Sequence, residues 1–105
     1  MPRTKSLAAL IEHYGEERIY NPKANKVPAI YKILNKHIFN NRLKNPKITI
    51  RRMHGALGLF EFNPYATKFC YKITIHNKFK NFREFVESLG HEMVHYYKKL
   101  ILKQM

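Results

Sequence analysis

The strongest pattern of apolar and polar positions lies in the last quarter of the chain. Apolar residues recur there at three- and four-residue spacing, at Phe82, Phe85, Val86, Leu89, Met93, Tyr96, Tyr97 and Leu100. This spacing places their side chains on one face of a helix. Asn81 suits the N-cap position, and Glu84, three residues later, can complete a capping box. The pattern therefore predicts a helix that starts just after Asn81.

Two further helices are predicted upstream of this one. Thr4 can cap a short helix over residues 5–14, which ends at Gly15, and residues 16–26 are predicted to be a connector. Pro28 suits the first turn of the next helix, which is predicted to end before Asn45. Its apolar face is expected to contain Ile30, Tyr31, Ile33, Leu34, His37, Ile38 and Leu43.

Between these helices and the last one lie three runs typical of β-strands, at residues 48–53, 59–62 and 69–75. Gly55 and Gly58 bracket a turn between the first two runs. The order of elements predicts an α+β fold, with helices packed on a small three-stranded antiparallel sheet. The chain is expected to form one domain over residues 1–105, with an N-terminal helix and connector at 1–26 and the core at 27–105.

The last predicted helix carries the motif His91-Glu92-Met93-Val94-His95. Positions four apart lie on one face of a helix, so the two imidazoles can point at one metal ion. Two neutral imidazoles bind zinc well, and Glu92 is placed to take a proton from a metal-bound water. The alternative is a solvated helix face that happens to carry two histidines.

The composition adds a strong positive charge. The chain has 20 Lys and Arg against 7 acidic residues, all of them Glu, and a formal net charge of +13. Such a balance favours a polyanionic partner, above all nucleic acid. The candidate contacts are basic residues interleaved with aromatics, namely Lys78, Lys80, Arg83, Lys98 and Lys99. The alternative is a solvated basic surface, because the charge is scattered along the chain.

The single cysteine and the hydropathy of the chain indicate its cellular compartment. Cys70 is the only cysteine, so it can form no disulfide within the chain, and it is expected to fill core in the third strand. A lone thiol fits a reducing compartment. The apolar run at residues 7–11 is too short for a secretory signal, and no segment approaches the length of a membrane span. We therefore expect a cytoplasmic protein, associated with nucleic acid and not with membrane.

Several segments match the pattern of one known family. They are Tyr31–Asn35, Phe39–Leu43, Pro46–Ile50, the turn with Met53, Gly55 and Gly58, the strand Tyr71–Ile75 followed by Asn77, and Leu89–His95. Together they resemble the SprT-like family of zinc metallopeptidases over roughly residues 27–97. The resemblance implies a zincin-like fold and a protein substrate, with His91 and His95 as zinc ligands and Glu92 as the catalytic base. The best-known members cut proteins crosslinked to DNA, so it also implies a link to DNA.

The chain departs from this family at the third zinc ligand. Family members supply a histidine downstream of the helix, but the ten residues after His95 contain no His, Asp or Glu. A catalytic zinc normally has three protein ligands. His76, His54, Glu61 and Glu84 are the upstream candidates for the missing ligand. Glu84 lies on the same helical face as His91, but two turns earlier, which is too far to share one ion. Three explanations stay open: a truncated chain, a ligand from elsewhere, or an inactive domain that binds nucleic acid or protein.

Overall fold

The computed structural model describes residues 19–67 and 70–104, and it confirms the α+β class. The helix predicted at residues 5–14 lies outside these residues. The described elements follow one another as α2 (Val27–Phe39), β1 (Lys47–Arg51), β2 (Gly58–Phe62), β3 (Tyr71–His76) and α3 (Phe82–Gln104). The motif helix is therefore α3, the last element, as predicted.

The sheet is mixed, so the prediction of an antiparallel sheet is wrong for one of its two strand pairs. The strand order is β1-β3-β2, with β1 parallel and β2 antiparallel to β3. β3 carries the fully buried Ile73, Thr74 and Ile75, whereas β2 alternates between exposed and half-buried positions. The most buried strand takes the centre. The chain therefore leaves a gap between β1 and β2, and β3 fills it.

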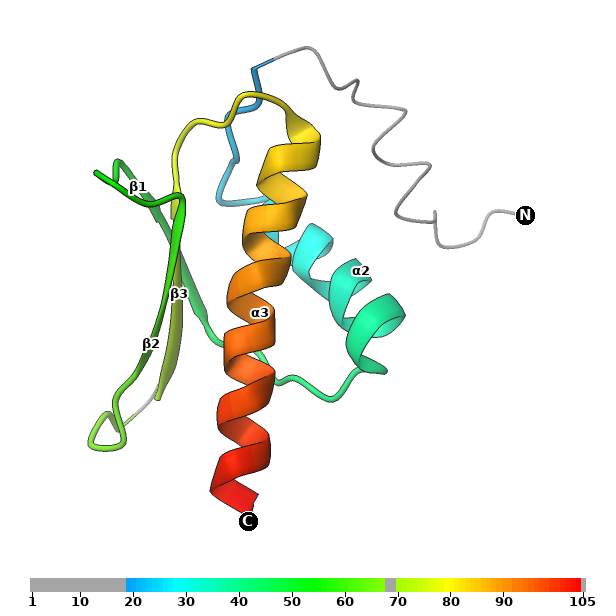
Figure 1. Cartoon of the computed structure of the whole chain (residues 1–105), viewed down its shortest axis with the longest axis vertical. Helices are drawn as coiled ribbons and strands as arrows, with labels where there is room; N and C mark the ends of the chain where they lie inside the picture. The colour runs from blue at the N-terminus through cyan, green and yellow to red at the C-terminus, as the bar shows by residue number, and fades with distance from the viewer. Residues whose placement is uncertain (1–18, 68–69, 105) are drawn as a thin grey trace.

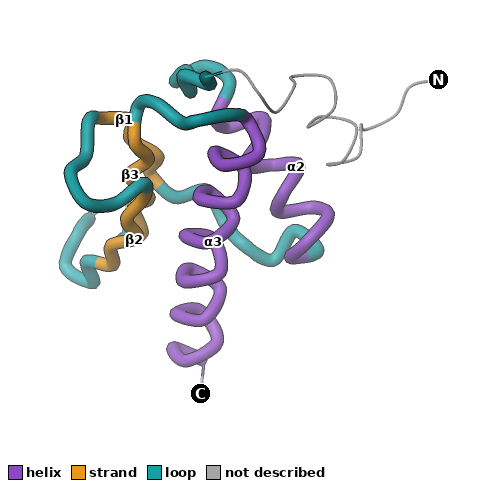
Figure 2. The backbone as a smooth tube through the Cα atoms, turned by 45° about the horizontal axis from the view of Figure 1, so that its top comes forward, coloured by secondary structure: helices purple, strands orange, loops and turns teal. Residues whose placement is uncertain are grey.

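The elements stack in layers, with the sheet on one side of α3 and α2 on the other (Figures 1 and 2). The core cluster combines apolar residues from α2, β3 and α3. Within the described residues no helix covers the opposite face of the sheet (Figure 1). We call that opposite side the outer face of the sheet.

Helix α2 ends earlier than its apolar pattern predicts. The chain turns out of the helix at Asn40 and Asn41, whose φ angles of 53° and 60° are left-handed. Asparagine is among the few residues that tolerate this conformation. Leu43 is still buried, but it lies in a loop held by the Asn35 side chain. Asn35 Nδ2 donates to Leu43 O at 2.8 Å, and Leu43 N donates to Asn35 Oδ1 at 3.1 Å.

Helix α3 begins as predicted. The Glu84 N–H donates to Asn81 Oδ1 at 2.8 Å, which confirms the N-cap. The Glu84 carboxylate reaches back to accept from the Lys80 N–H at 2.8 Å, one residue earlier than in a standard capping box. The predicted stripe is buried or half-buried along its length, from Phe82 to Leu100. The opposite side of α3 is left for the polar residues of the motif.

Candidate metal centre and its cleft

His91 and His95 lie next to each other on the exposed side of α3. Their Nε2 atoms are 3.2 Å apart and their rings are nearly perpendicular, at 84°. Two nitrogens that bind one tetrahedral zinc ion at about 2.0–2.1 Å lie roughly 3.3–3.4 Å apart. The pair is thus already spaced as two ligands of a single ion. The helix sets this spacing, because residues i and i+4 stack along one face.

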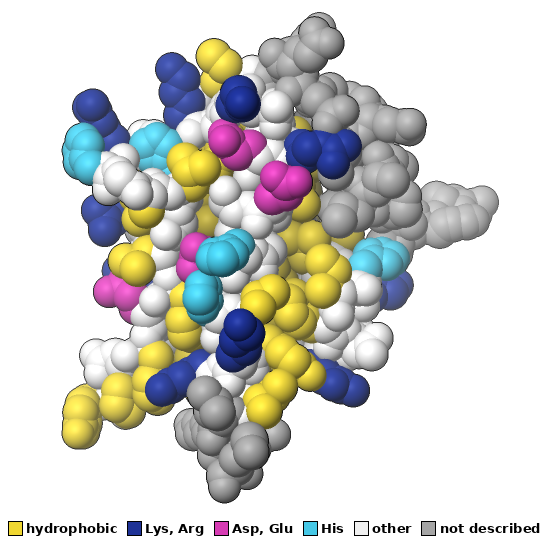
Figure 3. All heavy atoms as spheres, in the orientation of Figure 1, with side chains coloured by type: hydrophobic (Ala, Val, Ile, Leu, Met, Phe, Trp, Pro, Cys, Tyr) yellow, Lys and Arg dark blue, Asp and Glu magenta, His cyan; other side chains and the backbone are white. Residues whose placement is uncertain are grey.

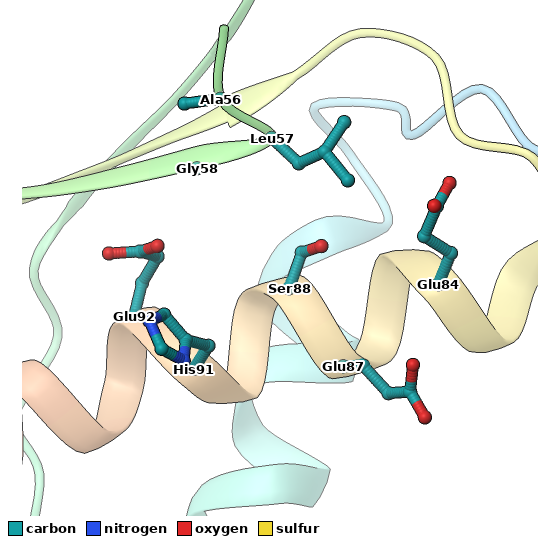
Figure 4. Close-up of a pocket in the computed structure, with 8 residues that line it drawn as sticks. All are labelled: Ala56, Leu57, Gly58, Glu84, Glu87, Ser88, His91 and Glu92. Carbon is teal, nitrogen blue, oxygen red and sulfur yellow. The ribbon is translucent and has the colours of Figure 1, made fainter.

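Glu92 occupies a different environment from its two histidine neighbours. Its side chain is only 7% exposed and forms no hydrogen bond or ion pair with any described residue. Figure 4 shows its carboxylate pointing from α3 toward the start of β2, beside the His91 ring. Neither of its carboxylate oxygens is among the fully buried polar atoms that lack a partner in the described residues. The carboxylate therefore reaches the open cleft, where water or a ligand can contact it.

Gly58 makes room for Glu92. A Cβ atom built on Gly58 would lie 2.9 Å from Glu92 Cγ and 3.0 Å from Glu92 Oε2. Any side chain at position 58 would displace the carboxylate or push β2 away from α3. The glycine, expected from the sequence only to bracket a turn, lets strand β2 pass directly over the motif.

An open cleft of about 480 Å³ runs along α3 beside the motif. Its walls are Ala56, Leu57 and Gly58 on one side and Glu84, Glu87, Ser88, His91 and Glu92 on the helix. Acidic and histidine side chains gather over this part of α3 on the surface (Figure 3). Glu84 was considered only as a third metal ligand, and Glu87 and Ser88 were not predicted as site residues. Their positions seven, four and three residues before His91 could have suggested a place in the cleft, because all of them lie on the motif side of the helix.

The structure does not bring a third predicted ligand to the histidine pair. Among residues 19–67 and 70–104, no group of three or more His, Cys, Asp or Glu is arranged to hold a metal. His76 instead accepts a hydrogen bond at Nδ1 from the Met53 N–H, at 2.9 Å, and its ring is nearly perpendicular to that of Phe79, with the ring centres 6.3 Å apart. His54 is exposed in the loop between β1 and β2.

The five basic residues predicted to contact nucleic acid do not form one surface. Lys78, Lys80 and Arg83 lie around the start of α3, and Lys98 and Lys99 lie near its end. Within α3, Arg83 and Lys98 are separated by about 22 Å along the helix axis, at roughly 1.5 Å per residue. Lys99 is also engaged, with Nζ 4.6 Å from the centre of the Phe62 ring.

Cys70 is half-buried and lies just before β3, outside the strand in which it was expected. Its Sγ atom is 3.6 Å from the Ala66 carbonyl oxygen, within the loop between β2 and β3. It therefore packs locally, away from the motif helix.

Comparisons of the chain with protein-family models, with curated proteins and with solved structures find no match. Kinship with SprT-like metallopeptidases rests on the motif and pattern of this sequence and stays a prediction. None of the helices in the described part of the chain is long and apolar enough to cross a membrane.

Proposed function

We propose that this chain is a zinc-dependent peptidase domain of the SprT-like type. The single observation that carries the proposal is the 3.2 Å separation of His91 Nε2 and His95 Nε2 beside a buried, unpartnered carboxylate. Two imidazole nitrogens this close together can bind one ion, and imidazole is a ligand that zinc prefers. A solvated helix face would give no reason for the burial of Glu92 or for the close approach of β2.

The roles of the residues follow from where they lie. Zinc, when bound, supplies a polarised, acidic water next to the peptide carbonyl. His91 and His95 would hold the ion, each through Nε2. The Glu92 carboxylate, free of other partners, would take the proton from the attacking water and pass it to the departing amine nitrogen. The Gly58 backbone, which closes over this carboxylate, excludes water from it on one side.

Strand β2 offers a way to hold the substrate backbone. Among the described residues β3 alone pairs with it, so it lies at an edge of the sheet, and its first residue lines the cleft. An edge strand presents unpaired N–H and C=O groups to which an extended peptide can add as a further strand. Such pairing would lay the peptide alongside the histidine pair with little dependence on its sequence.

A zinc-binding experiment on single histidine variants tests the proposal. His91→Ala and His95→Ala should each abolish stoichiometric zinc binding, measured by titration against a chromophoric chelator. His37→Ala, on the exposed side of α2, is the matched control and should bind as the parent chain does. His13→Ala, His54→Ala and His76→Ala complete the set of six histidines and identify any third ligand among them. Unchanged zinc binding in the His91→Ala/His95→Ala double variant would overturn the proposal.

Activity is tested separately through Glu92. Glu92→Gln should keep zinc and lose hydrolysis of an unfolded protein substrate. If hydrolysis persists in Glu92→Gln, the base lies elsewhere. If the parent chain binds zinc but hydrolyses no substrate, it is better explained as an inactive domain that binds nucleic acid or protein.

The outer face of the sheet favours nucleic-acid binding as a second candidate function. Residues that alternate with the core positions point to this face. The strand register places Lys47 beside Lys72 and Arg51 beside His76. Glu61 is the acidic residue of the same face, next to Lys72. Like charges on neighbouring strands repel, and the phosphates of a nucleic acid would neutralise them.

Fluorescence anisotropy with labelled DNA tests this surface. The affinity should fall steeply between about 50 and 200 mM salt, because bound phosphates release counterions. Lys47→Ala/Lys72→Ala should weaken binding and reduce the salt slope, whereas Lys23→Ala/Lys26→Ala, which removes equal charge near α2, should not. Weaker binding in Lys78→Ala/Lys80→Ala alone would place the contact at the start of α3 instead. No binding at 50 mM salt would exclude the function.

A further inference from the structure

The cleft beside the histidine pair is acidic on a basic molecule. Four glutamates fall within the described residues, and three of them, Glu84, Glu87 and Glu92, line this one cleft. The whole chain carries a net charge of +13. The negative charge of the described part is therefore concentrated where the proposed function places the substrate.

Helix stability explains only part of this cluster. Glu84 is the third residue of α3, where a carboxylate offsets the helix dipole, and it also accepts from the Lys80 N–H. Glu87 is the sixth residue of α3, beyond the first turn to which the dipole effect is confined. It forms no hydrogen bond or ion pair with any described residue. Glu87 thus has no structural role among the described residues.

Glu92 gives an independent indication that the cleft takes a ligand. It is more than nine-tenths buried, has no partner within the described residues, and is directed toward the cleft wall formed by β2 (Figure 4). The same view places Glu84 and Ser88 on the side of α3 facing Leu57, and Glu87 at the rim, turned away from the strand. A positive group that entered here would meet carboxylates at the floor and at the rim.

The other lining residues fit a long aliphatic stem. Ala56, Leu57, Gly58 and Ser88 are small or apolar. Lysine and arginine lay their methylene groups along such surfaces and keep their charged ends among polar groups. Along the axis, Glu87 is about 6 Å and Glu84 about 10 Å before His91, at roughly 1.5 Å per residue. An extended peptide advances about 3.3 Å per residue. If the bond to be cut lies at the histidine pair, a side chain one to three residues away from that bond would reach Glu87 or Glu84.

We propose that this cleft is a specificity subsite that binds a lysine or arginine side chain of the peptide close to the bond that is cut. The inference rests on the proposed peptidase function and names its substrate class. Glu84 and Glu87 are the residues that select the charge, and Leu57 packs on the stem. Peptides with a neutral side chain of equal length would bind less tightly.

The test uses three peptides that differ at one position, which is lysine, norleucine or glutamate. With the zinc-loaded chain, kcat/KM should be about fivefold higher for the lysine peptide than for norleucine, the size of effect expected of partly exposed ion pairs. Glu84→Gln/Glu87→Gln should remove that preference, so that kcat/KM becomes the same for the lysine and norleucine peptides. The glutamine amide introduced at position 84 keeps an oxygen for the Lys80 N–H, so the helix start is preserved. Glu61→Gln, on the outer face, is the matched control and should keep the preference.

Binding without turnover separates this inference from the proposed function. Anisotropy of the same labelled peptides with the Glu92→Gln chain should show the lysine preference, and the Glu84→Gln/Glu87→Gln change should remove it. Charge-selective binding with no hydrolysis by the parent chain would contradict the peptidase and support the subsite. Hydrolysis with equal rates for lysine and norleucine would overturn the subsite and leave the peptidase intact. Equal binding of all three peptides would likewise overturn the subsite.

Discussion

At the scale of single residues, two glycines near the motif have opposite surroundings. Gly58 on β2 is in contact with the Glu92 side chain, whereas a Cβ atom added to Gly90 on α3 meets nothing within 4 Å. A glycine inside a helix can reflect a close approach of another backbone or a tolerated irregularity. The open space around it excludes the close approach. The position where a side chain does not fit is Gly58.

The two positions give a matched pair of alanine substitutions. Gly58→Ala should destabilise the fold by about 1–3 kcal/mol, the usual cost of overpacking, and should reduce peptide hydrolysis by moving Glu92. Gly90→Ala should stabilise it by roughly 1 kcal/mol, because alanine is the better helix former. Urea unfolding of both variants measures these free energies.

A double-mutant cycle assigns the Gly58 effect to Glu92. In a Glu92→Ala background the clash is absent, so Gly58→Ala should cost clearly less than in the parent chain. An equal cost in both backgrounds would mean that the backbone of β2, and not the carboxylate, requires glycine.

At the scale of elements, a local clamp decides where α2 ends. Asn35 is buried and pairs with both backbone groups of Leu43, which brings the chain back after two left-handed residues. The apolar face of α2 would allow the helix to continue. The clamp instead lets Leu43 reach the core from a loop, and it sets the path of the chain into β1.

Removal of the clamp should therefore be costly. Asn35→Ala should lower the free energy of unfolding by about 1–3 kcal/mol, because the Leu43 N–H and C=O would stay buried without partners. His37→Ala, two residues away and exposed, should change it by less than about 0.5 kcal/mol. Chemical denaturation of both variants decides the matter. An equal change in the free energy of unfolding for Asn35→Ala and His37→Ala would show that water replaces the hydrogen bonds of the Asn35 side chain.

At the scale of the whole molecule, buried tyrosines join the three layers. The Tyr31 hydroxyl of α2 donates a hydrogen bond to the Lys44 carbonyl, and the Tyr96 ring of α3 packs against Phe60 and Tyr71 of the sheet. Burial raises the pKa of Tyr31 far above its ordinary value of 10.0, and burial also raises the pKa of Tyr96. The Tyr71 hydroxyl is buried without a hydrogen-bond partner in the described structure.

These raised pKa values predict a loss of stability in alkaline solution. The pKa of Tyr31 is higher in the folded chain than in the unfolded chain. Its contribution to the free energy of unfolding is therefore fully present below pH 10 and is lost as the pH rises above 10 toward the folded pKa. Unfolding by urea at several pH values between 8 and 11, followed by circular dichroism, should show this loss. Tyr31→Phe removes one titrating group, so its stability should depend less on pH above 10. The same pH dependence in the parent chain and in Tyr31→Phe would rule out this origin.

Elements whose contacts are local could be predicted from the sequence. The start of α3, its apolar stripe and the pairing of His91 with His95 depend on residues within one or two turns of a helix, and the structure confirms the cap and the stripe. The class of fold followed from the order of such elements. The zinc ligands and the base were named from spacing alone, and their function stays a prediction.

Features that depend on residues far apart in the chain appear only in the folded molecule. The antiparallel prediction failed because strand order is set by which strand is most buried, and that emerges only when the sheet meets α3. Three features arise where β2 crosses α3: the burial of Glu92, the need for glycine at position 58, and the acidic cleft. Gly58 and Glu92, which meet there, are 34 residues apart in sequence. No periodic pattern encodes such a contact. Two surfaces must pack before a glycine becomes the only residue that fits.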